Sequence, residues 1–251
     1  MLFFQEPSPT RFDLRFGIAG IPVRVHPTFW LIALLFGSAS GDLAGLLVWI
    51  PAVFVSILVH ELGHAFAMRR FGRPSHITLY FGGGLTVPEA VSWGYRQADV
   101  SLTINQEIIV SLAGPAAGFL LAGLVLAGVW AAGGSLGLTF LFGVLPYPLA
   151  QLPAGGWLIG LVIGSLLWVN IFWGLINLMP VYPLDGGQVA RYAWLKRNPW
   201  DGVRRSLWLS VIAGAIVALL GLILLNSLYV ALLFGMLAFQ SYRSLQGRLG
   251  M

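Results

Sequence analysis

Long apolar stretches dominate this chain and restrict it to folds that are stable inside a lipid bilayer. A helix of about 20 apolar residues crosses the hydrocarbon core of a membrane, and 58% of the residues are hydrophobic whereas only 9% are charged. Six stretches are predicted to be transmembrane helices, the first of them short: residues 28–41, 43–68, 105–133, 155–178, 205–226 and 228–246. We therefore expect an all-α membrane protein in which residues 1–251 form a single polytopic domain.

The positions of the basic residues support six transmembrane helices. All 14 lie before the first stretch, between the second and third, between the fourth and fifth or at the first residue of the fifth (Arg205), or in the last turn of the sixth and beyond it (Arg243, Arg248). A six-helix topology places all of them on one side, and basic residues mark the cytoplasmic side. Both termini are then cytoplasmic, and the net charge of +5 is explained without nucleic acid as a partner.

A seventh apolar segment, residues 136–152, is interrupted by Pro146 and Pro148. If it crossed the membrane, the basic residues would be distributed over both sides. We therefore predict that it is a loop in or near the membrane interface.

The second stretch contains the motif His60-Glu61-Leu62-Gly63-His64. Residues four apart lie on one face of a helix, so His60 and His64 can bind one metal ion while Glu61 reaches a metal-bound water. Ionisable groups are costly inside a membrane and mark functional sites there. The chain has no cysteine, so any further protein ligand is a histidine or a carboxylate.

A hydrolytic zinc site usually has three protein ligands and one open position, so a third ligand must be found. Asp185 is the best-placed candidate, because it follows Pro180 at the cytoplasmic end of the fourth stretch and precedes two glycines that allow a tight turn. Glu107, near the start of the third stretch, is also possible. His26 and His76 adjoin basic residues and strand patterns, and we interpret them as structural or interfacial.

Apolar and polar residues alternate before the first stretch and again between the second and third. This period of two predicts short strands, which we expect to form a small membrane-associated β-sheet. Ile77, Leu79 and Phe81 belong to the second pattern, and Gly83 lies in the glycine run that follows. A sheet edge can pair with an extended peptide, which makes these four residues candidates for substrate binding. A plain connecting hairpin explains the pattern equally well.

Two motifs occur together, each in its own predicted membrane helix: residues 60–64 and the segment Asn177-Leu178-Met179-Pro180-Val181-Tyr182-Pro183-Leu184-Asp185-Gly186-Gly187. Residues 20–27, Gly82-Gly83 and Ala113-Gly114-Pro115 accompany them. In these motifs the sequence resembles the site-2 protease family of intramembrane zinc metalloproteases. The resemblance implies one Zn²⁺ per chain bound by His60, His64 and Asp185, with Glu61 as the general base.

The resemblance also implies that two asparagines of the fourth helix, Asn177 and Asn170, help to position the substrate backbone. One position departs from the family, because Gly118 stands where many members carry an asparagine after the Gly-Pro of the third helix. The resemblance is to a minimal form, without a PDZ or CBS nucleotide-binding domain.

The expected activity is hydrolysis of a peptide bond in the transmembrane segment of membrane-protein substrates, as in regulated intramembrane proteolysis. The partners are these substrates and the lipid bilayer. We expect a bacterial or archaeal cell membrane, with the active site toward the cytoplasm. A divalent-metal transporter is an alternative, although its ligands would be spread along several helices. A catalytically silent scaffold that binds membrane helices is another, and it would lack bound zinc.

Overall fold

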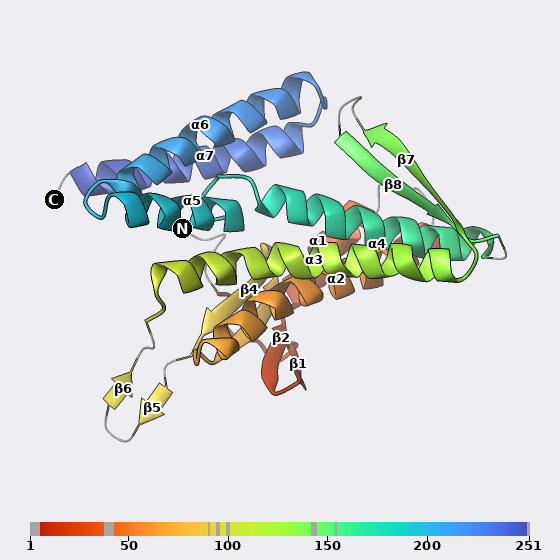
Figure 1. The fold of residues 1–251 in the computed structure, drawn as a ribbon, viewed down its shortest axis with the longest axis horizontal. Coiled ribbons are helices and arrows are strands. Elements are labelled where there is room, and N and C mark those ends of the chain that lie inside the picture. Colours follow the sequence, from red (N-terminus) through yellow and green to blue (C-terminus); the bar gives the residue numbers. More distant parts are fainter. Residues whose placement is uncertain are drawn as a thin grey trace.

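The computed structural model describes residues 6–37, 43–89, 91–93, 96–98, 101–141, 145–153 and 155–249. The chain is mostly helical, and long helices lie side by side with strands at their two ends (Figure 1). Within the described residues, five helices are long and apolar enough to cross a membrane, as expected of an integral membrane protein. They are α2 (Leu43–Arg70), α3 (Ile104–Ala131), α4 (Gly156–Asn177), α6 (Gly202–Ile223) and α7 (Leu228–Leu249).

The first predicted transmembrane helix, over residues 28–41, is not confirmed. The structure has α1 at Pro27–Gly37, which is 11 residues long. At 1.5 Å per residue this helix extends about 17 Å, roughly half of the ~30 Å hydrocarbon core. Residues 38–42 lie outside the described part of the chain, so a total of six transmembrane helices stays a prediction.

The predicted small sheet is confirmed, and it has four strands in the order β1-β2-β3-β4. These strands are β1 (Leu14–Ile18), β2 (Ile21–Val25), β3 (Ser75–Tyr80) and β4 (Gly83–Pro88). The central pair, β2 and β3, runs parallel with Val23 opposite Ile77 and Val25 opposite Leu79, and the outer pairs are antiparallel. These four apolar side chains share one buried core with Ile57 of α2, so the sheet is packed against the helix that carries the histidines.

The segment predicted as an interfacial loop, residues 136–152, contains a β-hairpin instead. Strands β7 (Ser135–Leu141) and β8 (Leu145–Gln151) pair antiparallel along their whole length. Proline lacks a backbone donor but is tolerated in edge strands, and both strands of an isolated hairpin are edges. Pro146 and Pro148 therefore do not prevent strand formation. In Figure 1 the hairpin projects from the opposite end of the bundle to α5 (Asp185–Arg197).

Helix α5 occupies the connection between α4 and α6, for which the sequence analysis proposed no helix. Its last turn is attached to the start of α3, because Lys196 Nζ donates a hydrogen bond to Asn105 Oδ1 at 2.9 Å. A second short hairpin, β5 (Val91–Trp93) with β6 (Arg96–Ala98), lies between the sheet and α3. The end of α2, the start of α3 and the whole of α5 therefore lie at the same end of the bundle.

Helices α2 and α3 approach most closely at Gly63. A Cβ atom at this position would lie 2.9 Å from the Cβ of Ala117 and would overlap the carbonyl oxygen of Ala113. Small residues permit such close contacts between membrane helices. The glycine inside the histidine motif is therefore required by packing, independently of any chemistry.

Replacing Gly63 with alanine is expected to destabilise the protein by about 1–3 kcal/mol, the usual cost of forcing extra atoms into a packed interface. The measurement is thermal unfolding of the purified protein in detergent. Gly123→Ala in α3 is the matched control, because no atom lies within 4 Å of its added Cβ. Equal melting temperatures for the two variants would show that α2 and α3 are not packed as described.

Candidate metal centre

The structure brings His60 and His64 together with Asp185, which lies 125 residues beyond His60 in the sequence. The two imidazoles come from successive turns of α2, and their Nε2 atoms are 3.2 Å apart. Asp185 is the first residue of α5, and its Oδ2 lies 3.1 Å from His60 Nε2 and its Oδ1 lies 3.4 Å from His64 Nε2. Both histidines are buried and the aspartate is nearly so.

The spacing of these atoms fits a zinc ion. Zinc binds nitrogen and oxygen ligands at about 2.0–2.1 Å in tetrahedral geometry, which places neighbouring ligand atoms about 3.3 Å from one another. The two Nε2 atoms are 3.2 Å apart, and each faces a different oxygen of Asp185, at 3.1 and 3.4 Å. Within the described residues, His60, His64 and Asp185 are the only group of three or more potential metal ligands.

The tautomer of His64 is set by α3. His64 Nδ1 lies 2.7 Å from the carbonyl oxygen of Val110, and because a carbonyl only accepts, Nδ1 must carry the proton and donate. The lone pair of Nε2 is then free for a metal ion. Such a hydrogen bond on the far nitrogen is the usual support of a histidine ligand.

Asp185 is positioned by the two glycines that follow it. A Cβ at Gly187 would lie 2.5 Å from the carbonyl carbon of Val181, and one at Gly186 would overlap the carbonyl oxygen of Leu178. The start of α5 can therefore lie against the end of α4 only with glycine at both positions. Burial raises the pKa of Asp185 but the neighbouring imidazoles lower it more, to about 2, so it is a carboxylate at neutral pH.

Glu61 is buried beside the three candidate ligands and is not one of them. Its carboxylate accepts a hydrogen bond from Thr86 Oγ1 of β4 at 2.7 Å. On another side it touches the backbone of β4 at Gly84, where an added Cβ would lie 2.5 Å from Glu61 Cδ. A strand of the sheet therefore holds this carboxylate beside the candidate ligands.

Three other candidates from the sequence make different contacts. Glu107, the alternative third ligand, forms an ion pair with Arg73 at 3.3 Å. His76 Nε2 lies 3.1 Å from a carboxylate oxygen of Glu6, and His26 Nδ1 is within 2.7 Å of a hydroxyl two residues later in the chain. None of them belongs to the group that includes His60.

The two asparagines of α4 are placed differently from each other. Asn170 is buried, and its Nδ2 donates to Ser56 Oγ at 2.8 Å and to the carbonyl of Leu166 at 2.9 Å. It therefore ties α4 to α2. Asn177 ends α4, and its Nδ2 donates to the carbonyl of Trp173 at 2.9 Å. Its position just before the segment that carries Asp185 leaves it the better candidate for contact with a substrate.

The strand residues expected to contact a substrate do not all lie at an edge. Ile77 and Leu79 are fully buried in β3, which pairs with β2 on one side and β4 on the other. Phe81 lies in the turn after β3 and Gly83 begins β4. The edge next to α2 is therefore β4, and sequence analysis missed its contact with Glu61 through Thr86. The alternating pattern predicts a strand here but gives no sign of that hydrogen bond.

Apolar helices enclose two histidines, a glutamate and an aspartate. This arrangement is typical of the active site of a membrane-embedded metallopeptidase. Residues 48–220 match the protein family described as Peptidase family M50, and the chain belongs to this family. The resemblance to site-2 proteases drawn from the motifs is thereby confirmed.

Rip3 of Mycobacterium tuberculosis is 30% identical over 222 residues, which cover 80% of this chain and 48% of Rip3. A zinc metalloprotease of Methanocaldococcus jannaschii is 26% identical over 225 residues, which cover 86% of this chain and 57% of that protein. The chain thus spans about half the length of these curated relatives. The solved structure of the site-2 protease from M. jannaschii superposes with a TM-score of 0.55 at 24% identity, covering 93% of this chain and 95% of that one, which shows a shared fold.

Helix α3 leaves room for the imidazoles at Gly114, where an added Cβ would lie 2.8 Å from His60 Nε2 and would overlap His64 Nε2. Gly114→Ala is therefore expected to lower the bound zinc from about one ion per chain to near zero, as measured by elemental analysis of purified protein. Gly118→Ala is the control, because its added Cβ would come no closer than 3.5 Å to any atom. Full zinc occupancy in Gly114→Ala would contradict the described placement of the imidazoles.

Proposed function

We propose that this chain is an intramembrane zinc metalloprotease that hydrolyses a peptide bond in the transmembrane segment of membrane-protein substrates. The observation that carries this proposal is the approach of His60, His64 and Asp185 to within 3.4 Å of one another, with the carboxylate of Glu61 beside them and outside the ligand set. Membership in the M50 family supports it. The biological role is regulated intramembrane proteolysis.

When bound by His60, His64 and Asp185, zinc supplies a Lewis acid that lowers the pKa of a water and polarises the scissile carbonyl. Glu61 is the general base: it takes the proton of the attacking water and returns it to the leaving nitrogen. Asp185 is ionised at neutral pH, and His64 Nδ1 donates to the carbonyl of Val110, which leaves Nε2 as the nitrogen that would bind the ion. Metal binding requires the carboxylate form of Asp185 and an Nε2 without a proton.

A transmembrane helix must unwind before its backbone can be cut, because its amides are already hydrogen-bonded. The edge strand β4, which begins at Gly83, can hold the freed segment in an extended form by β-pairing. Asn177 binds a carbonyl or amide of the unwound backbone, and Phe81 lines the same region. Substrates in this proposal are single helices cut near their cytoplasmic ends.

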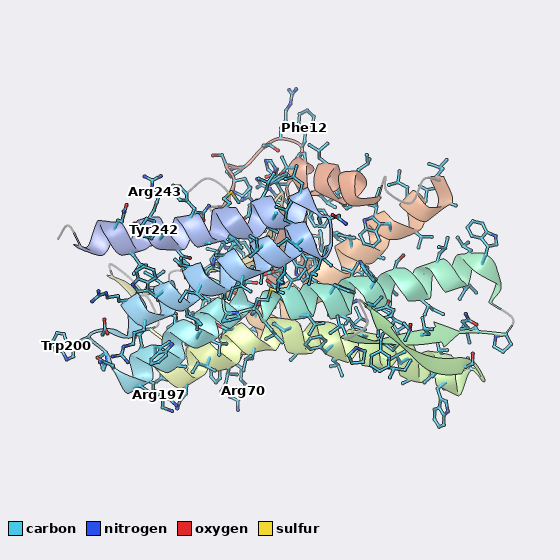
Figure 2. The ribbon with its side chains drawn as sticks, turned by 90° about the horizontal axis from the view of Figure 1, so that it is seen from above. Phe12, Arg70, Arg197, Trp200, Tyr242 and Arg243 are labelled. Atoms are coloured by element: carbon cyan, nitrogen blue, oxygen red, sulfur yellow. The ribbon has the colours of Figure 1, made fainter. Side chains whose placement is uncertain are left out.

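The proposed topology is a single domain of six transmembrane helices with both termini in the cytoplasm. Arg70 of α2, Arg197 of α5 and Arg243 of α7 gather at one end of the bundle (Figure 2). Glu61 lies eight residues before Arg69, about 12 Å along the helix axis. By the positive-inside rule the site faces the cytoplasm, in a bacterial or archaeal cell membrane.

The position of the site argues against a metal transporter. A transport path needs polar ligands distributed along the helices, whereas the ligand group here lies at one end of α2. A complete candidate ligand set, with Glu61 beside it and not part of it, also argues against a catalytically silent scaffold.

The proposed activity is tested with purified protein in liposomes and a panel of labelled single-span membrane peptides. Wild-type protein is expected to cleave at least one peptide, a chelator to stop the reaction and added zinc to restore it. Glu61→Gln is expected to lower the rate by about 10²–10⁴-fold while zinc stays bound. Equal cleavage by the wild type, by the wild type with chelator and by Glu61→Gln would refute the assignment of Glu61 and zinc. Zinc flux that survives Glu61→Gln would favour transport.

The topology is tested with single cysteines, since the natural chain contains none. Trp200 is 98% exposed in the connection between α5 and α6, and Ser135 is exposed at the start of β7. A membrane-impermeant maleimide is expected to label Trp200→Cys from the cytoplasmic side only and Ser135→Cys from the opposite side only. Labelling of both from one side would exclude the six-helix arrangement.

A further inference from the structure

We propose that Thr86 is a positioning residue that holds the Glu61 carboxylate in its reactive orientation and links it to the edge strand β4. This inference rests on the proposed function, because a fixed orientation of Glu61 matters only if Glu61 removes a proton from water at the metal centre. The proposal is carried by the hydrogen bond from Thr86 to the Glu61 carboxylate and by one close backbone contact.

The hydroxyl of Thr86 lies within reach of two acceptors on Glu61. Its Oγ1 is 2.7 Å from Glu61 Oε2 and 3.1 Å from the Glu61 backbone oxygen. A hydroxyl has one proton to donate, and the carboxylate oxygen is both nearer and charged. The 2.7 Å distance is that of a charge-assisted hydrogen bond, which is about twice as strong as a neutral one.

The same strand confines the carboxylate from a second side. Glu61 is 5% exposed, and a Cβ at Gly84 would lie 2.5 Å from Glu61 Cδ and would overlap its Oε1 and Cγ. Thr86 and Gly84 lie two residues apart on β4, and both therefore restrict the position of the Glu61 carboxylate. A carboxylate has about four acceptor sites, so the bond to Thr86 leaves capacity for the attacking water.

This contact connects the base to the proposed substrate-binding strand. Thr86 lies in the middle of β4, opposite Ile77 of β3, and β4 is an edge of the sheet. A peptide added to that edge would order the strand that carries the threonine hydroxyl. Binding of an extended substrate therefore stabilises the orientation of Glu61, and a misplacement of about 1 Å in an active site can cost 10²-fold in rate.

The sheet contains a matched control for this role. Thr78 Oγ1 of β3 donates to Glu6 Oε1 at 2.8 Å, so this hydrogen bond also links a sheet threonine to a glutamate. Glu6 is bound by Arg24 and lies outside the candidate metal group. Removal of the Thr78 hydroxyl costs a comparable hydrogen bond without touching the base.

The experiment measures kcat, KM and zinc content of the zinc-loaded protein in liposomes, with the labelled single-span peptide that the wild type cleaves. For Thr86→Val we expect kcat to fall about ten- to a hundredfold, the effect of losing a hydrogen bond to a charged group. KM and zinc content should stay within about twofold of the wild type. Thr86→Ser should restore kcat to within about threefold, and Thr78→Val should leave it unchanged.

Wild-type kcat in Thr86→Val, no recovery in Thr86→Ser, or an equal loss in Thr78→Val would each overturn the positioning role. The proposed function would still stand if Glu61→Gln were inactive in the same assay. If Thr86→Val loses zinc or melts at a lower temperature, the comparison is made between Thr86→Ala and Thr86→Ser, and equal kcat values in that pair overturn the proposal. Absence of cleavage by the wild type would instead refute the proposed function itself.

Discussion

The centre depends on close backbone approach, which glycine alone permits at each point of contact. Gly63 brings α3 against α2, and Gly114 leaves space for the two imidazoles. Gly84 lets the sheet touch Glu61, and Gly186 lets α5 lie against the end of α4. Polar groups are costly in an apolar interior unless they are paired. The glycines reduce this cost because they let the two imidazoles, Asp185 and Glu61 lie close to their partners.

The sheet and the helices contribute different parts of the same site. Helix α2 provides three of the four side chains of the candidate centre, and α5 provides the fourth. The sheet shares its core with α2, and β4 contacts Glu61 through Thr86. The edge strand β4 is therefore fixed to the helix that bears Glu61.

Part of this architecture could be predicted from the sequence because it depends on local periodicity. Hydropathy located the five long helices to within a few residues, and the four-residue spacing placed His60 and His64 on one face. The length of α1 could not be predicted in this way, because the small residues 38–41 (Ser-Ala-Ser-Gly) give no sharp hydropathy boundary after the apolar run. The hairpin of residues 135–151 was missed because its prolines were taken to exclude strands, whereas the two edges of a hairpin tolerate them.

Contacts between distant segments were harder to predict. Position along the chain favours Asp185 over Glu107 as the third ligand but does not exclude Glu107. The fold decides between them, because Glu107 pairs with Arg73. The alternating pattern identified β3 and β4 but not the parallel pairing of β3 with β2. That pairing makes β3 an interior strand and leaves β4 as the edge. The hydrogen bond from Thr86 to Glu61 likewise depends on how sheet and helix meet, which no local pattern encodes.

The separation of the ligands along the chain has a consequence for biogenesis. The two imidazoles belong to the second helix to be synthesised, and the carboxylate follows 125 residues after the first of them. A growing polypeptide therefore lacks a complete ligand set until α3 and α4 have entered the bilayer and α5 has folded back beside them. Completion of the candidate ligand set is therefore a late step in synthesis, and it joins the early and late parts of the newly made protein.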